Sequence, residues 1–189
     1  MHEERDRHSQ IARESRKRQF LAGRILLRLL LAQELGGTCN EWKLSVGSGE
    51  RPRVQGRSDC HLSVAHSGDW VSCAVSSQPV GVDVEVEKTH WQLPEMFSWV
   101  CPHLKWEDIQ REVAEADRVR LLLIFWTMKE DCFKKTGEEL HLQPPSISLQ
   151  GFDKAAPREA DAWSIYQKKE NRVVSVVAEG KGCDLKWVR

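Results

Sequence analysis

The chain has 189 residues, of which 40% are hydrophobic and 30% are charged, and its formal net charge is zero. This composition excludes collagen-like and disordered chains, and the length allows one compact unit. The longest apolar stretch, residues 25–32, is interrupted by Arg28 and falls short of the roughly 20 residues that a membrane span needs.

The N-terminal part of the sequence predicts one long helix, which starts near Ser9 or Ser15 and ends at Leu35. Gly36 and Gly37 follow, and glycine readily adopts the left-handed conformation that closes helices. After a loop rich in Gly, Ser and Arg, two strands are predicted, at residues 61–64 and 71–76.

A strict alternation over residues 80–87 predicts a strand, with valines on one parity and mostly acids on the other. Successive side chains of a strand point to opposite faces. The valines can therefore enter a core while Asp83 and Glu85 project together, roughly 7 Å apart along the backbone. The pattern brings two carboxylates to one place.

The C-terminal part predicts a second long helix over residues 117–136, ended by Gly137. Three strands are expected to follow, near residues 147–149, 163–167 and 173–178. A helix followed by three strands would thus occur twice, although the two stretches share no visible sequence identity.

Glu130 falls on the apolar stripe of this second helix, together with Trp126 and Phe133. Because an unpaired buried charge is costly, we expect a lysine or a cation beside it, and Lys134 lies one turn later on the same face. Three acids with neighbouring bases suit Mg²⁺ and a phosphate-containing substrate. From spacing alone, a solvated edge strand and an ordinary surface ion pair are an equally good interpretation.

The six cysteines include no Cys-x-x-Cys pair, which indicates reduced thiols. The charged first residues resemble neither a secretory signal nor an organellar transit peptide, so we expect a cytoplasmic protein. Residues 1–30 are rich in Lys and Arg, whereas residues 81–130 carry more acids than bases. This asymmetry fits an anionic ligand held next to a cation.

Two motifs resemble the signatures of the Sfp-type 4′-phosphopantetheinyl transferases. Residues 81–85, Gly-Val-Asp-Val-Glu, are similar to the family's Gly-Val/Ile-Asp-Val/Ile-Glu strand. Residues 126–134 match the family's Trp-x-x-Lys-Glu-x-x-x-Lys helix. Both motifs are intact and in the family's order.

Three further stretches resemble the same family. Residues 62–71 approximate its Ser-His-Ser turn, with Ala65 in place of the common serine and His66 retained. Residues 16–28 match its Arg-rich helix start, and residues 49–52 loosely match its Gly-Lys/Arg-Pro turn. The resemblance covers almost the whole chain.

The resemblance implies an α+β fold, the 4′-phosphopantetheinyl transferase fold, built as a pseudo-dimer of two helix-plus-three-strand halves around a coenzyme A site. We expect residues 1–78 to form the N-terminal half and residues 79–189 the C-terminal half with the metal site. The family's first strand has no counterpart before the first helix, so we expect the N-terminal half to lack it, with coenzyme binding as the property most affected.

The implied activity is Mg²⁺-dependent transfer of 4′-phosphopantetheine from coenzyme A to a serine of an apo carrier protein, which releases adenosine 3′,5′-bisphosphate. The carrier would serve fatty-acid, polyketide or nonribosomal peptide synthesis. Asp83, Glu85 and Glu130 would hold the metal, with Glu130 as general base and Lys134 neutralising the leaving phosphate. A basic set would bind the phosphates of the coenzyme: Arg7, Arg18, Arg51, His66 and Lys134. We expect a monomer that binds neither nucleic acid nor membrane.

Two functions of other classes fit parts of the pattern. A metal-dependent nuclease also uses an Asp, a Glu and a Lys, but its lysine typically follows the second acid on the same strand, where this chain has Val86 and Glu87. With a net charge of zero, the chain also lacks the excess of basic residues expected of a protein that binds nucleic acid. The other alternative is a non-catalytic module that binds coenzyme A or a carrier protein.

Overall fold

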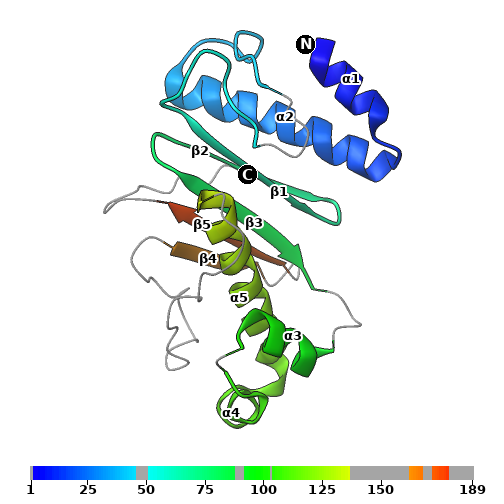
Figure 1. Cartoon of the computed structure of the whole chain (residues 1–189), viewed down its shortest axis with the longest axis vertical. Helices are drawn as coiled ribbons and strands as arrows, with labels where there is room; N and C mark the ends of the chain where they lie inside the picture. The colour runs from blue at the N-terminus through cyan, green and yellow to red at the C-terminus, as the bar shows by residue number, and fades with distance from the viewer. Residues whose placement is uncertain are drawn as a thin grey trace.

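The computed structural model of the chain describes residues 2–45, 51–87, 92–102, 104–136, 162–167 and 172–178. Within these residues lie five helices and five strands, in chain order α1 (His2–Gln10), α2 (Glu14–Leu35), β1 (His61–Ser67), β2 (Trp70–Ser76), β3 (Val80–Val86), α3 (Leu93–Val100), α4 (Trp106–Glu112), α5 (Glu115–Thr136), β4 (Ala162–Gln167) and β5 (Arg172–Ala178). The α+β class predicted from the sequence is confirmed (Figure 1). The strand expected near residues 147–149 lies outside the described residues.

The single N-terminal helix expected from the sequence is two helices. α1 ends at Gln10 and α2 begins at Glu14, with Arg13 in an extended conformation between them. α1 carries almost no apolar residue, so it does not continue the apolar stripe of α2. Instead it is tied to α2 by Glu4, whose carboxylate accepts a hydrogen bond from Arg28 at 2.7 Å. The predicted end at Leu35 is confirmed, and Gly36 has a φ of 82°.

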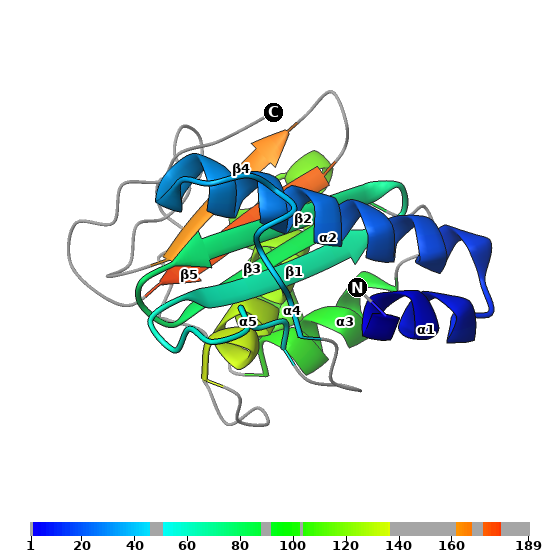
Figure 2. The ribbon, with the colours of Figure 1, turned by 90° about the horizontal axis from the view of Figure 1, so that it is seen from above.

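The strands form two small antiparallel sheets. β1 pairs with β2, and α2 lies across this pair, as Figures 1 and 2 both show. The second sheet has the order β3-β5-β4, with β5 in the middle. Its register places Asp83 of β3 directly opposite Ser175 of β5. α5 covers one face of this sheet (Figure 1).

Strand parity decides which side chains meet α5. The valines of β3 (Val80, Val82 and Val84) pack with Ala65 of β1 on the face away from α5. Val173 and Val177 of β5 pack instead into the large core of α5. Residues of the opposite parity on β3, which include Asp83 and Glu85, therefore face α5, as the alternation predicts.

Side-chain hydroxyls of β1 close the open edge of β3. The backbone N–H of Val82 donates to Oγ of Ser63 at 3.0 Å, and that of Val86 donates to Oγ of Ser67 at 3.3 Å. Both serines are buried. These bonds satisfy N–H groups that an edge strand would otherwise expose. Ser63 meets Val82 and Ser67 meets Val86, so β1 of the first sheet runs parallel to β3 of the second.

None of the described helices is both long and apolar enough to span a membrane.

Candidate active site

The site is built where α5 packs directly against β3. Gly81 permits this approach, because a Cβ at this position would collide with the backbone carbonyl of Asp131 on α5. The absence of a side chain at Gly81 thus determines how closely the last turns of α5 pack on the sheet. Those turns carry Glu130 and Lys134.

Asp83 and Lys134 form an ion pair at this contact. Lys134 Nζ donates to Oδ1 of Asp83 at 2.5 Å and to the carbonyl of Val82 at 3.1 Å. Asp83 is only 5% exposed, and burial raises the pKa of its carboxyl to about 6. Lys134 opposes that rise, whereas the negative charges of Glu85 and Glu130 add to it. Glu85 and Glu130, the other two predicted metal ligands, are therefore near enough to act electrostatically on Asp83.

Glu85 is held by a residue from the other sheet. Ser67 Oγ donates to Oε2 of Glu85 at 2.7 Å while it accepts the N–H of Val86. One buried hydroxyl therefore fixes both the strand and the carboxylate. The hairpin β1–β2 thus has a direct part in placing an acid of β3.

The donor set fits a divalent cation, although the arrangement is not that of a closed metal site. Asp83 Oδ2 is buried and has no hydrogen-bond partner among the described residues, and a cation would supply one. Asp and Glu oxygens are the ligands that Mg²⁺ prefers. However, among the described residues no three His, Cys, Asp or Glu side chains converge closely enough to enclose a metal ion. The Lys134 ammonium supplies the positive charge beside Asp83 instead.

Asp131 is a buried acid that sequence reasoning missed. It is 0% exposed, and Oδ2 accepts a hydrogen bond from Ser175 Oγ on β5. Burial, and then the charge of Asp83, raise the pKa of Asp131 well above its usual range. Its place next to Glu130 in the helical motif was visible in the sequence, but its partner on β5 was not.

His66 lies in a group of positive charges. Arg16 of α2 donates to Nε2 of His66, which requires a neutral ring because arginine cannot accept. Removal from water, followed by the charges of Arg16 and Lys134, lowers the pKa of His66 to about 4. Arg7 of α1 belongs to the same group, because its charge adds to the effect of burial in lowering the pKa of Arg16. Arg7, Arg16, His66 and Lys134 are thus electrostatically linked.

The structure does not bring the other two predicted coenzyme ligands into this group. Arg18 is exposed on α2, and its charge acts on Glu14. Arg51 donates to the backbone carbonyls of Phe133 and Lys135, at 3.0 and 2.9 Å. Arg51 therefore caps the C-terminal end of α5, where carbonyl groups lack partners within the helix.

The other two specified positions of the helical motif, Trp126 and Lys129, are used for packing. Trp126 lies against Trp99 of α3, with ring centroids 5.0 Å apart. Lys129 donates to the carbonyl of Trp99 at 3.1 Å and lies over its ring. Both residues tie α5 to α3 rather than facing Asp83.

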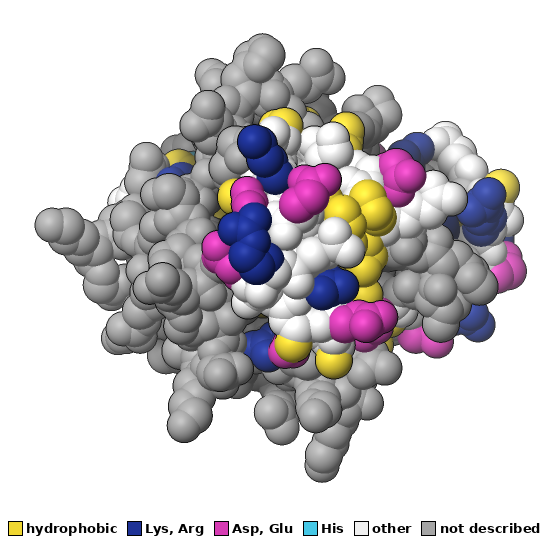
Figure 3. Space-filling model, turned by 90° about the horizontal axis from the view of Figure 1, so that it is seen from below, with side chains coloured by type: hydrophobic (Ala, Val, Ile, Leu, Met, Phe, Trp, Pro, Cys, Tyr) yellow, Lys and Arg dark blue, Asp and Glu magenta, His cyan; other side chains and the backbone are white. Residues whose placement is uncertain are grey.

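Figure 3 shows the end of the molecule that carries α4, where acidic, basic and hydrophobic side chains are interspersed.

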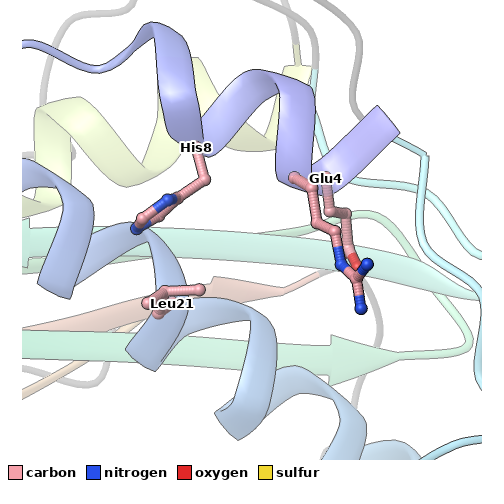
Figure 4. A pocket seen from close by; sticks show the side chains of 4 residues that line it. Glu4, His8 and Leu21 are labelled. Carbon is pink, nitrogen blue, oxygen red and sulfur yellow. The ribbon is translucent and has the colours of Figure 1, made fainter. Parts of the chain in front are cut away.

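A hollow of about 220 Å³ lies between α1 and α2, apart from the acids of β3. Figure 4 shows His8 of α1 and Leu21 of α2 facing each other, with Glu4 farther along α1. Arg5 completes its lining. None of these four residues is among the predicted site residues.

Two cysteine thiols, of Cys73 and Cys101, are poor candidates for a nucleophile. Cys73 and Cys101 are free, and burial raises the pKa of each to about 12. The reactive thiolate form would therefore scarcely be present near neutral pH.

Comparisons with known proteins agree with the residues assembled here. A family model described as the 4′-phosphopantetheinyl transferase superfamily matches residues 79–177, which include the acids of β3 and the charged turns of α5. The chain is 27% identical to the 4′-phosphopantetheinyl transferase Sfp of Bacillus subtilis (strain 168), over 69% of this chain and 57% of Sfp. It is 26% identical to the 4′-phosphopantetheinyl transferase HetI of Nostoc sp., over 90% of this chain and 75% of HetI. This chain thus spans little more than half the length of Sfp.

Proposed function

Because this chain belongs to the 4′-phosphopantetheinyl transferase superfamily, we propose that it transfers 4′-phosphopantetheine from coenzyme A to a serine of an apo carrier protein. In this reaction the serine oxygen attacks the phosphorus that bears pantetheine. The bond from that phosphorus to the bridging oxygen breaks, and adenosine 3′,5′-bisphosphate leaves. The hydroxyl proton passes to a base of the protein.

The observation that carries this proposal is the pairing of Lys134 with Asp83 inside a group of acids from two elements. Phosphoryl transfer depends mainly on positioning and on neutralising charge. Carboxylates beside a fixed ammonium provide both functions, since the acids can hold a cation and the ammonium can face a phosphate. Lys134 reaches Asp83 because Gly81 has no Cβ that would hold α5 away from β3.

Asp83, Glu85 and Glu130 would hold a Mg²⁺ ion, which when bound neutralises the pyrophosphate of the coenzyme. The unpartnered Oδ2 of Asp83 supports this assignment. Glu130 would accept the proton of the attacking serine as general base. Lys134 would stabilise the negative charge on the departing phosphate.

The positive group at the end of β1 would bind the phosphates of the coenzyme. His66 and Arg16 are in contact, Arg7 acts on Arg16, and Lys134 acts on His66. Arginine and lysine donors suit phosphate oxygens. Coenzyme binding by Arg18 and Arg51 stays a prediction, and Arg51 would have to leave the end of α5 to do so.

We propose that residues 1–78 and 79–189 form two related halves with the coenzyme between them. The contact of β1 with β3 through Ser63 and Ser67 supports this arrangement. So does the influence of Lys134, from the second half, on the pKa of His66 in the first. A ligand with several phosphates could reach both residues at once.

The experiment that tests the proposal is incubation of the full chain with coenzyme A, Mg²⁺ and a panel of apo carrier proteins. The panel should represent fatty-acid, polyketide and nonribosomal peptide synthesis, and intact mass would reveal the added arm. We expect at least one carrier to gain 4′-phosphopantetheine. We also expect Glu130→Gln to lose transfer while Glu112→Gln, which changes an exposed acid of α4, keeps it. Binding of coenzyme and metal without any mass gain would identify a binding module instead.

A further inference from the structure

Asp131 is a carboxyl in a place that disfavours charge. Both Asp131 and Ser175 are 0% exposed. Ser175 Oγ donates to Oδ2 of Asp131, but Oδ1 is buried and finds no hydrogen-bond partner in the part of the chain that the structure describes. A buried polar atom without a partner costs free energy, and a small uncharged side chain would avoid that cost. The carboxyl therefore does not serve the stability of the fold alone.

The position of this contact links it to the site. Ser175 lies directly opposite Asp83 in the register of β3 and β5, so the Cβ atoms of the two residues are about 5 Å apart on the same face of the sheet. Asp131 lies between Glu130 and Lys134 along α5. The contact from Asp131 to β5 therefore lies beside the contact from Lys134 to β3.

Apolar packing is not directional, so the core around α5 limits its rotation less sharply than hydrogen bonds to two neighbouring strands do. Lys134 provides one attachment, to Asp83 on β3. Asp131 provides the second, to Ser175 on β5. A roll of α5 about its axis would carry Glu130 and Lys134 in the same direction, because helical residues move as one body.

We propose that the hydrogen bond between Asp131 and Ser175 is a positioning contact that fixes the rotation of α5, so that Glu130 and Lys134 face the reacting phosphate. This inference rests on the proposed transfer of 4′-phosphopantetheine. Asp131 acts here through Glu130 and Lys134 and does not touch the substrate. Asp131 occupies one of the unspecified positions of the Trp-x-x-Lys-Glu-x-x-x-Lys motif.

The test compares transfer kinetics with stability in Asp131→Ser, Asp131→Asn and Ser175→Ala. We expect Asp131→Ser and Ser175→Ala to lower kcat about ten- to a hundredfold, because small misplacements of catalytic groups have effects of that size. The KM for coenzyme A should change less than about twofold, since a positioning contact acts on the chemical step rather than on binding. Asp131→Asn keeps an acceptor oxygen for Ser175 and should recover much of the lost kcat.

Stability measurements separate positioning from a merely structural role. We expect the urea midpoint of Asp131→Ser to equal or exceed that of the wild type, because the orphaned oxygen is removed. Thr127→Ala is the matched control, since Thr127 is also 0% exposed on α5 but its hydroxyl donates within the helix, to the carbonyl of Ile124. It should lower the urea midpoint and leave kcat unchanged. The double variant Asp131→Ser, Ser175→Ala should be no slower than the slower single variant.

Each outcome bears on the inference. Wild-type kcat in Asp131→Ser overturns it, as does a loss of kcat that follows the urea midpoint across all variants. A wild-type chain that modifies no carrier overturns the proposed function and this inference together. A wild-type chain that transfers while Asp131→Ser transfers equally well overturns this inference alone.

Discussion

Lys134 Nζ lies 2.5 Å from Oδ1 of Asp83 and joins the last turns of α5 to the middle of β3. The two residues come from motifs that are more than forty positions apart in the chain. Their contact places a positive charge against a carboxyl that is almost fully buried. A divalent cation on Asp83 would therefore share this carboxyl with Lys134 or displace its ammonium.

The first prediction concerns the pH dependence of stability. Burial raises the pKa of Asp83 from 3.8 to about 6 in the folded chain. Between these values the folded chain keeps a proton that the unfolded chain has released, so the contribution of Asp83 is full below about pH 4 and declines as the pH rises to about 6. We expect the free energy of unfolding of the wild type, relative to Asp83→Asn, to fall by about 2 kcal/mol across this range.

Urea unfolding at several pH values measures this difference, and Mg²⁺ provides an independent check. At pH 7, Mg²⁺ should raise the urea midpoint of the wild type, because a cation binds the charged carboxylate. It should have little effect on Asp83→Asn. Parallel pH profiles of the two proteins would show that Asp83 does not hold its proton as described.

The second prediction concerns Gly81. In Gly81→Ala the added Cβ meets the carbonyl of Asp131, so α5 must move away from β3. We expect a loss of about 2 kcal/mol in the free energy of unfolding, as is usual for overpacking. Transfer should fall further than the lost stability explains, because Glu130 and Lys134 move with the helix. In Gly23→Ala the added Cβ meets side-chain methyl groups, of Val64 at 3.1 Å and of Val71 at 3.6 Å, and the change should be milder in both respects.

The stability and the transfer activity of Gly81→Ala are measured separately. Urea unfolding gives the stability, and the transfer rate is measured under conditions in which each variant is fully folded. Equal transfer by folded Gly81→Ala and wild type would mean that the depth at which α5 sits on β3 does not matter to the site.

The third prediction distinguishes two roles for Arg51. Its guanidinium donates to the carbonyls of Phe133 and Lys135, so Arg51→Met should cost about 1 kcal/mol of stability by leaving the end of α5 uncapped. If this is its role, kcat should fall while the KM for coenzyme A changes little, since Lys134 lies in the same turn. A large rise in that KM with unchanged kcat would instead assign Arg51 to the phosphates of the coenzyme.

The sequence predicted the parts of the site that depend on local periodicity. Alternation along β3 placed the valines in a core and Asp83 and Glu85 on the other face, and the core around Val82 and Val84 confirms this division. The helical stripe was a weaker guide for α5. Residues 121–125 are all buried, because the helix packs against the sheet on one side and against α3 on another, so no single stripe marks its inner face.

The partners of these residues could not be predicted from spacing. Ser175 reaches Asp131 across 44 positions, and Arg51 reaches Phe133 across 82. Such contacts depend on how elements pack, which period and propensity do not encode. The choice between Arg16 and Arg18 beside His66 likewise depends on the rotation of α2, since both belong to the same Arg-rich stretch.

The most direct measurement is a crystal structure of the chain with coenzyme A and Mn²⁺ in place of Mg²⁺, with the metal located by anomalous scattering. We predict one metal ion bound by oxygens of Asp83, Glu85 and Glu130 at about 2.1 Å, the distance expected for a small divalent cation, and in contact with the pyrophosphate of the coenzyme. A metal bound elsewhere, or coenzyme bound with these three carboxylates apart from it, would contradict the proposed site.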